Sequence, residues 1–542
     1  MTERWHPLVR KARRQLAEGR MERREFLRTV TLLGVSSAAA YGMAGGILGE
    51  SLVDPALAQS GETPEKGGIL RVAMQVQKME DPATFSWVEM SNQSRHTLEY
   101  LAITGPDNVT RPMLAESWEP SDDLKTWTFN IRRGVKWHNG DELVADHVRW
   151  NVERWCEPAL GSANTGLSSI GAMLEDVDGE KRLRADAIEV VDDHTIRFHL
   201  SVPVLSVPED FYNYPTAIVH PSFEPPFSAN PIGTGPFTLT ELAVGDRCTL
   251  RRVTETTDGQ PFEYWGGEVH LDGIDYYNFD EDNQLVAFAG GDVDTIYEFG
   301  VEQLEFAKAL EGTILEARTS QTLCCRFKVT QPPFDDVRVR RALVKGVDNT
   351  VFKDLVFQGS GDVGWNHHVA PVHPAHFELP PLERDVEGAK ALLAEAGYGD
   401  GLELTIDVGN TDGPWHQTVC EIIRDQWADI GVSLNINVMP ASRFWEIWDQ
   451  TPFGATAWTH RPLATMILAL GYRSGVPWNE TEYANPEFDA ALAEAEATFD
   501  VKERRAKMAR VQQILQDDAV MVQPIFRPVF TIVNDRVRGL EP

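Results

Sequence analysis

The segment from Leu402 to Val438 restricts the fold most, because two strand patterns flank one helix pattern. Apolar and polar side chains alternate over residues 402–408, as one buried strand face requires, and the alternation returns over residues 434–438. Between these runs, apolar residues recur at helical spacing, and the pattern ends at Gly431, a residue typical of helix ends. A strand, a helix and a strand of these lengths predict a βαβ unit with two parallel strands. The predicted fold class is therefore α/β.

Other patterns predict antiparallel additions to this class. Residues 126–132 alternate as a half-buried strand, and residues 187–200 indicate a hairpin with its turn at two aspartates and a histidine. Apolar side chains over residues 144–155 recur at helical spacing. A further helix is expected between an N-cap at Asp385 and a stop at Gly397.

A basic head and an uncharged stretch open the chain. Arg23 and Arg24 are adjacent and precede Phe26 and Leu27, and residues 29–48 carry no charge but are low in large apolar side chains. Such a stretch has the length of a bilayer span without the usual hydrophobicity. The paired arginines resemble a twin-arginine export signal, an address that a translocase reads.

Small residues at alternate positions follow this stretch. Ala56 and Ala58 fit the site that a signal peptidase cleaves, so we expect residues 1–58 to be removed and residues 59–68 to form a flexible mature N-terminus. The predicted location is the periplasm, and the twin-arginine translocase is the predicted partner during export. The alternative is an N-terminal membrane anchor that is never cut.

The composition excludes some partners. The 542 residues include 82 acidic and 50 basic side chains, for a formal net charge of −32. This charge repels nucleic acid and anionic membranes, and the length predicts two or three domains. The cysteines are too sparse for a disulfide framework and are expected to be buried thiols: Cys156, Cys248, Cys324, Cys325 and Cys420.

Signatures of enzymes are missing from the sequence. It contains no G-x-S-x-G, no H-E-x-x-H and no P-loop lysine motif. Its G-x-G-x-x-G, at Gly359, Gly361 and Gly364, follows a helix-like run and leads towards Pro371, whereas a dinucleotide site needs a strand before it and a helix after it. We therefore predict no catalytic residues and no cofactor.

Four histidines cluster in the next loop, at His367, His368, His373 and His376. Imidazoles are good ligands for zinc, nickel or copper, so a metal site is one interpretation. Adjacent histidines cannot easily face one ion, and prolines separate the others. The sequence therefore favours a surface or cleft-lining loop over a metal site.

Several long motifs occur in the order of one known family. The sequence over residues 112–154 resembles the signature of extracytoplasmic solute-binding proteins of family 5, the dipeptide, oligopeptide and nickel binders of ABC importers. Further matches are GTGPF (233–237), EYWGG (263–267), GGDVD (290–294), PPFDDVRVRRALVKGVD (332–348) and DVEGAKALLAEAGY (385–398).

The resemblance implies a two-lobed periplasmic binding protein-like fold of class II type, which closes over ligand in a cleft. The implied organisation is an N-terminal lobe over 69–318 with an extra subdomain near 95–210, a second lobe over 319–519, and a return to the first lobe over 520–542. The implied function is a receptor, not an enzyme, that delivers a small-molecule or peptide-like solute to ABC permease transmembrane subunits. The alternatives are a chaperone-like or sensory binder, a nickel or metal-complex binder, and a secreted hydrolase or metal enzyme.

The resemblance also indicates ligand-binding positions. Dipeptide-binding members carry a Trp-Thr-Gly-Asp segment, and this chain reads Trp458 and Thr459 and then His460 and Arg461 in place of glycine and aspartate. In an earlier loop, Asn410 stands roughly where relatives place an arginine. Both charges that hold a dipeptide zwitterion are therefore absent or reversed.

These replacements predict the chemistry of the ligand. Arg461 suits a carboxylate or another anionic or carbonyl-rich group, while Trp458, Trp478 and Tyr483 are expected to form an aromatic wall, with His460 and Asn410 also near the ligand. The alternative for Arg461 is an ion pair with an acidic side chain that braces its loop.

Overall fold

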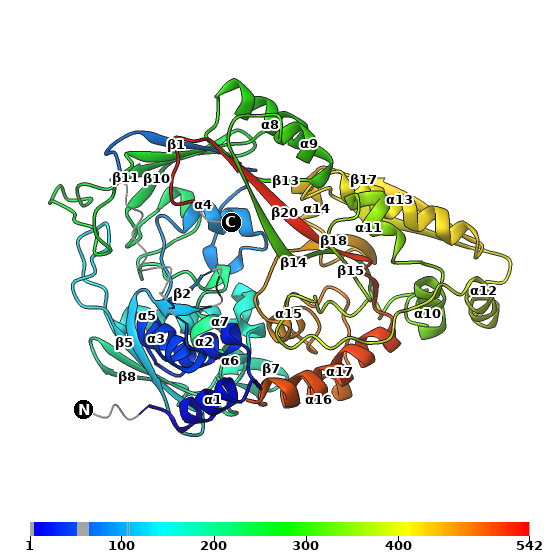
Figure 1. Ribbon diagram of the computed structural model, residues 1–542, viewed down its shortest axis with the longest axis horizontal. Coiled ribbons are helices and arrows are strands. Elements are labelled where there is room, and N and C mark those ends of the chain that lie inside the picture. The colour runs from blue at the N-terminus through cyan, green and yellow to red at the C-terminus, as the bar shows by residue number, and fades with distance from the viewer. Residues whose placement is uncertain (1–4, 51, 53–63, 106, 108, 541–542) are drawn as a thin grey trace. The chain divides into compact units, whose positions relative to one another are not determined.

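The computed structural model describes residues 5–50, 52, 64–105, 107 and 109–540 (Figure 1). The chain divides into two compact units: unit 1 comprises Met1–Tyr297 and Val533–Glu541, and unit 2 comprises Glu298–Ile532. The family resemblance implied lobe boundaries at 318/319 and 519/520, whereas the compact units divide after Tyr297 and after Ile532.

Unit 1 is built from mixed helices and strands. Its elements are α1 (Pro7–Ala17), α2 (Arg23–Leu32), α3 (Ser37–Leu48), β1 (Ile69–Ala73), η2 (Pro82–Thr84), α4 (Val88–Ser94), β2 (Ala102–Thr104), β3 (Thr110–Pro112), β4 (Ala115–Pro120), β5 (Thr126–Ile131), α5 (Ala145–Trp155), η3 (Pro158–Leu160), η4 (Ala163–Gly166), α6 (Ser168–Gly171), β6 (Leu174–Val177), β7 (Glu180–Leu183), β8 (Ile188–Asp192), β9 (Thr195–His199), α7 (Val207–Asp210), η5 (Tyr214–Thr216), η6 (Phe227–Ala229), β10 (Phe237–Ala243), β11 (Arg247–Arg252), β12 (Gly273–Tyr277), α8 (Glu281–Gly290) and β13 (Thr295–Phe299), which ends at the boundary.

Two larger sets of paired strands organise unit 1, in addition to the short pairs β2-β3 and β6-β7. In the first, the strand order is β10-β11-β12-β1-β13, and β1 runs parallel to both of its neighbours. The second is antiparallel with the order β4-β5-β9-β8, which confirms the predicted strand at 126–132 and the predicted hairpin. Phe129, Phe198 and Phe211 pack against one another beside it, with ring centroids 5.1–5.6 Å apart.

The first helices of the chain belong to unit 1. In Figure 1, α1, α2 and α3 lie beside the sheet that contains β5. Over the described stretches of the chain, no helix has both the length and the apolar character needed to cross a membrane. Ala56 and Ala58, the predicted cleavage positions, fall outside the described residues.

Unit 2 is an α/β unit. Its elements are η7 (Val301–Gln303), α9 (Leu304–Ala307), β14 (Thr313–Phe327), α10 (Val337–Lys345), α11 (Val351–Phe357), β15 (Asp362–Val363), α12 (Val386–Glu395), β16 (Leu402–Val408), α13 (Trp415–Ala428), β17 (Val432–Val438), α14 (Ala441–Phe444), β18 (Phe453–Trp458), α15 (Ala464–Gly471), α16 (Pro486–Glu496), α17 (Val501–Asp518), β19 (Met521–Val522) and β20 (Ile525–Val533), whose last residue returns to unit 1.

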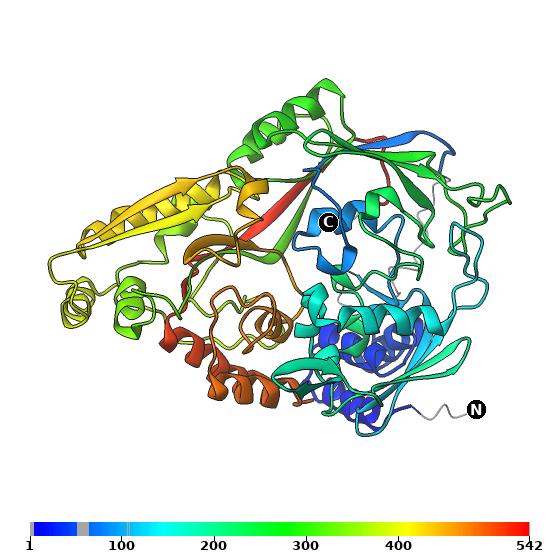
Figure 2. The ribbon, with the colours of Figure 1, turned by 180° about the vertical axis from the view of Figure 1, so that it is seen from behind.

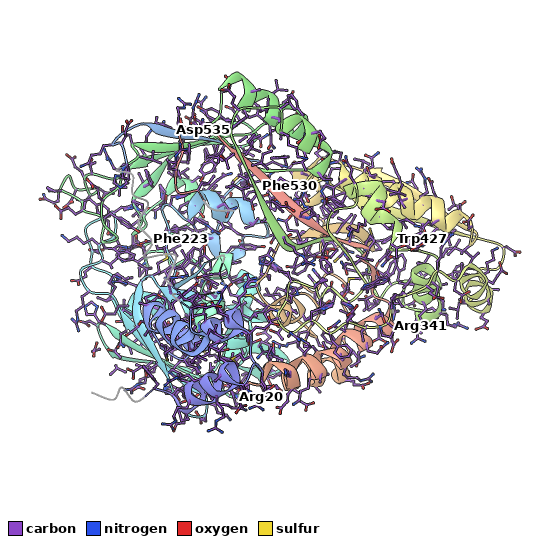
Figure 3. The ribbon with its side chains drawn as sticks, viewed as in Figure 1. Arg20, Phe223, Arg341, Trp427, Phe530 and Asp535 are labelled. Carbon is purple, nitrogen blue, oxygen red and sulfur yellow. The ribbon has the colours of Figure 1, made fainter. Side chains whose placement is uncertain are left out.

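The sheet of unit 2 has the order β20-β14-β18-β16-β17. Strands β16 and β17 pair in parallel over their full lengths, and α13 runs along them (Figure 2), which confirms the predicted βαβ unit. The apolar face of α13 carries Trp427, which Figure 3 marks. Its ring stacks on Phe453 at 5.9 Å, and its Nε1–H donates to the carbonyl of Leu343 at 2.8 Å, so this large side chain is both packed and satisfied.

The predicted helix cap at Asp385 is confirmed. Its side chain accepts a hydrogen bond from the backbone N–H of Gly388 at 2.8 Å, and α12 follows. The glycine motif at 359–364 follows α11 and includes β15, and two of its glycines approach the main chain closely. A Cβ on Gly361 would lie 2.4 Å from the carbonyl oxygen of Phe526, and one on Gly364 would lie 2.3 Å from that of Gln523. These glycines therefore permit close backbone packing in unit 2.

Candidate functional site

Two loops that carry predicted ligand residues leave the same edge of the unit 2 sheet. Strand β18 pairs in parallel with β16, with Val408 opposite Ala455. The carboxyl ends of parallel strands lie at one edge of a sheet, which is where ligands bind in many α/β folds. The loop after β16 contains Asn410 and the loop after β18 contains Arg461, so the topology brings these two predicted positions to one edge.

Trp458 ends β18 and lies in an aromatic cluster. Its ring meets Trp478 edge to face at 6.0 Å and His368 at 5.4 Å. On one side the backbone of Gly471 is so close that an added Cβ would lie 2.9 Å from the indole ring. The structure therefore brings Trp458 and Trp478 together, and both rings are buried. Their role as a wall of the ligand site stays a prediction.

A buried carboxylate holds the Trp458 indole. Glu480 Oε1 accepts the Trp458 Nε1–H at 2.9 Å, while Glu480 Oε2 accepts from Arg326 Nε at 2.7 Å and from Thr456 Oγ1 at 2.6 Å. Arg326 is itself fully buried on β14. Charge-assisted bonds of this kind fix geometry, so the ring orientation of Trp458 is set by residues behind it. Sequence patterns contain no signal for Glu480 or Arg326, because their contact is non-local.

His460 occupies an exposed position beside β14. Its Nδ1 accepts the backbone N–H of Ser320 at 3.1 Å, which leaves the proton of the neutral imidazole on Nε2. The Ser320 hydroxyl also accepts the backbone N–H of Arg461 at 3.1 Å. Ser320 thus fixes both residues that replace the glycine and aspartate of dipeptide binders.

Arg461 is buried, with 6% of its surface exposed. Its Nη1 donates to Thr459 Oγ1 at 2.7 Å and to the carbonyl of His460 at 3.1 Å. From the other side, His373 Nε2 donates to the carbonyl of Arg461 at 3.1 Å. The guanidinium and the backbone are therefore held within the loop, and a buried arginine presents a fixed positive group to any anion that reaches it.

The histidine cluster is not on the surface, and that part of the expectation is wrong. His367, His368 and His373 are buried, while His376 is half-buried. Burial lowers the pKa of His367 and of His368 to about 3 and lowers that of His373 well below its usual value.

These histidines are therefore neutral hydrogen-bonding groups in the core of unit 2. His373 braces the Arg461 loop, and His368 Nδ1 lies 2.8 Å from the Tyr472 hydroxyl. In the part of the chain that the structure describes, no group of three or more histidine, cysteine, aspartate or glutamate side chains is placed to hold a metal ion. The five cysteines, all described, are buried free thiols, as expected.

The two remaining predicted ligand residues have structural contacts. Asn410 adopts a left-handed backbone with φ of 43°, and its Oδ1 accepts the backbone N–H of Gln417 in the first turn of α13 at 3.1 Å. Tyr483 is buried, donates its hydroxyl to Asp518 and packs edge-on against Phe488 at 5.6 Å. Those contacts place Tyr483 against α16 and α17. A ligand-binding role for either residue stays a prediction.

Two compact α/β units in one chain, joined by a return of the last residues to the first unit, define a class of solute-binding proteins. Residues 109–472 match the model of the bacterial extracellular solute-binding proteins, family 5. This match spans more than half of the chain, and the chain belongs to that family.

Individual relatives differ in the ligand that their names state. The periplasmic oligopeptide-binding protein OppA of Haemophilus influenzae is 26% identical over 84% of this chain and 86% of its own. Heme-binding protein A of the same organism is 28% identical over 79% of this chain and 81% of its own. The solved structure of AgaA from A. tumefaciens R10 with agropinic acid matches with a TM-score of 0.75 at 22% identity, covering 88% of this chain and 95% of that one, and shows the likeness of fold.

Proposed function

We propose that this protein is the periplasmic solute receptor of an ABC importer and that it captures a small peptide-like or carboxylate-bearing solute. The observation that carries the proposal is the position of Arg461 in the loop that follows Trp458, at the sheet edge where the loops after β16 and β18 emerge. The names of its relatives support a peptide-like solute.

The site favours a negatively charged end of the ligand. A guanidinium forks onto carboxylate oxygens and stays charged at every working pH, and aromatic rings contribute apolar contact area. At the position where dipeptide binders carry the aspartate for a ligand ammonium, this chain has Arg461. The recognised group is therefore a carboxylate or a comparable anion.

A melting-shift assay tests the proposed function. Binding to the native state alone raises stability by about 2.7 kcal/mol at a hundred times Kd, so a true ligand should raise Tm in a concentration-dependent way. The probes are di-, tri- and oligopeptides with a free carboxylate, each beside its C-terminal amide, together with opines and heme. We expect the free acids to shift Tm more than the amides.

Two outcomes of this assay would contradict the proposal. Equal Tm shifts for the free acid and its amide would show that the protein does not recognise the carboxylate of the ligand. Mass spectrometry would show whether a compound that binds is chemically converted during the assay. Such conversion would contradict the proposal that the protein is a receptor.

Replacing Arg461 with methionine separates ligand contact from loop bracing. If Arg461 binds the ligand, Arg461→Met should weaken binding by about 1.5–3 kcal/mol, roughly 10- to 150-fold in Kd, with little change in the Tm of the free protein. Calorimetric titration with a hit from the assay above measures this. Arg424→Met, at an exposed arginine on α13, is the matched control. A lower Tm with unchanged Kd would show that Arg461 only braces the loop.

The arginine pair is proposed to direct export through the twin-arginine translocase, after which residues 1–58 are removed. Conversion of both Arg23 and Arg24 to lysine keeps the charge but removes the guanidinium pair that defines the motif. We expect precursor to accumulate in the cytoplasm, as measured by fractionation and immunoblotting. Normal periplasmic yield of the double variant would refute this route.

A further inference from the structure

The helix that carries the arginine motif is buried along most of its length. In α2, every residue from Glu25 to Leu32 is buried, including Phe26 and Leu27, whereas Arg23 and Arg24 are exposed. A helix whose whole circumference is covered belongs to a packed core. Segment 5–50 therefore packs as part of unit 1 and is not an appendage.

A buried ion pair lies at the centre of the contact between α2 and the rest of unit 1. Arg28 Nε donates to Glu209 Oε1 at 2.6 Å and Arg28 Nη2 donates to Glu209 Oε2 at 2.7 Å, a two-pronged geometry, while Glu25 lies 3.4 Å from Nη1. Glu209 belongs to α7 and is 181 residues away in sequence. Both side chains are almost fully buried, at 4% and 1% exposure. Removing one partner of such a pair leaves an uncompensated charge in the core.

Around the ion pair, further hydrogen bonds join segment 5–50 to the rest of unit 1. The Trp118 Nε1–H donates to the carbonyls of Thr31 and Leu32 at 3.2 and 3.1 Å, at the end of α2 where helix carbonyls have no partner within the helix. The Tyr41 hydroxyl donates to Asp107 Oδ2 at 2.7 Å. At Gly34, with φ of +85°, a Cβ would lie 2.7 Å from the carbonyl oxygen of Trp118, so only glycine fits this approach.

We propose that this face of unit 1, defined by Asp107, Trp118 and Glu209 and here named the docking face, binds the N-terminal segment (residues 5–50) of the same chain in the folded full-length protein. In the docked state, the apolar half of the arginine motif is hidden and the arginine pair is accessible. The docking itself does not depend on the proposed function. Only its consequence rests on that proposal: a translocase that reads the whole motif must first extract α2 from the docking face.

Charge and shape both select this occupant. Glu209 needs a buried cation with two parallel N–H donors, which an arginine provides and a lysine does not. Trp118 needs paired carbonyl acceptors, which the end of a helix provides. Segment 5–50 supplies both the Arg28 guanidinium and the carbonyls of Thr31 and Leu32, and each meets its partner on the docking face.

Hydrogen exchange of the purified full-length chain tests the docking without ligand or translocase. We expect amides of residues 26–32 to exchange as slowly as those of β5, because both lie in the core of unit 1. Arg28→Met should accelerate exchange in α2 by about 100-fold or more, since it strands Glu209 in the core. Arg24→Met, at an exposed position in the first turn of the same helix, is the matched control and should have a much smaller effect.

A charge exchange supplies the second measurement. Arg28→Glu and Glu209→Arg should each accelerate exchange in α2, and the double variant should recover a large part of the protection, because the pair is restored with its charges swapped. Free exchange of α2 in the unsubstituted chain, or equal effects of Arg28→Met and Arg24→Met, would overturn the docking. If docking is present but Glu209→Gln leaves the rate of export unchanged in a pulse-labelling experiment, the proposed consequence for export is wrong.

Discussion

Replacing Arg326 with methionine is expected to lower the free energy of unfolding by about 3–5 kcal/mol. Arg326 is fully buried, and its Nε donates to Glu480 Oε2 at 2.7 Å. Its Nη groups donate to the carbonyls of Thr451, at 2.6 Å, and of Trp448. Methionine fills similar space but provides no donor, so the Glu480 carboxylate and two carbonyls lose their partner in the core. Urea denaturation followed by tryptophan fluorescence measures the loss.

The same strand provides a matched control for this prediction. Arg318 on β14 pairs with Asp362 at 2.6 Å, but 63% of its side chain is exposed. Exposed pairs contribute about 0–1 kcal/mol, so Arg318→Met should have a small effect. Adding Glu480→Gln to Arg326→Met should restore part of the loss by removing the stranded charge. Equal losses for the two arginine variants would contradict a buried ion pair as the cause.

The second large effect is a pH dependence that originates at Glu99. This carboxyl is buried in unit 1, and it accepts hydrogen bonds from Tyr264 Oη at 2.8 Å, Trp265 Nε1 at 2.7 Å and Thr234 Oγ1 at 2.7 Å. Burial raises the pKa of Glu99 from 4.5 to about 7, because loss of water disfavours the charged form more than the three donors favour it.

The direction of the effect follows from which state holds the proton. Below pH 4.5 the carboxyl is protonated in both the folded and the unfolded chain, so Glu99 costs the folded state no stability. As the pH rises from 4.5 to about 7, the unfolded chain releases the proton while the folded chain retains it, so stability falls. Above that window the loss from Glu99 reaches about 3 kcal/mol.

Substitution of Glu99 by glutamine removes the titration while keeping an acceptor for Trp265 and Thr234. We expect the stability difference between Glu99→Gln and the unsubstituted protein to move in favour of the variant by about 3 kcal/mol between pH 4.5 and pH 8. Urea denaturation at a series of pH values measures this difference. Glu116→Gln, at an exposed glutamate on β4, should follow the unsubstituted protein throughout. A pH-independent difference for Glu99→Gln would show that the carboxyl does not titrate in this range.

Local patterns predicted much of the secondary structure correctly. The alternation over 402–408 and 434–438 became β16 and β17, and the helical spacing between them became α13. The cap at Asp385 begins α12, because an aspartate that accepts an N–H of the first turn is favoured whatever the surroundings. Periodicity and capping act over a few residues, so they can be read directly from the chain.

Predictions that depended on side-chain environment were less accurate. The histidines at 367, 368 and 373 look polar in sequence, and their loop is interrupted by prolines, yet they lie in the core. Burial keeps each imidazole neutral, and His367 and His373 have hydrogen-bond partners at both ring nitrogens, whereas His368 has the Tyr472 hydroxyl at Nδ1. Composition alone predicts such residues at the surface, because the distant groups that hydrogen-bond to them cannot be seen in the sequence.

The sequence by itself determined the α/β class, the order of strands and helices around 402–438, and the family. These depend on short-range periodicity and on sequence motifs that can be recognised without a structure. Only the tertiary structure decided that Glu480 orients Trp458, that His373 braces Arg461, and that Arg28 meets Glu209 in unit 1. Those pairs are separated by 22, 88 and 181 residues. Their energies come from burial and from hydrogen bonds between distant segments, which exist only once the chain has folded.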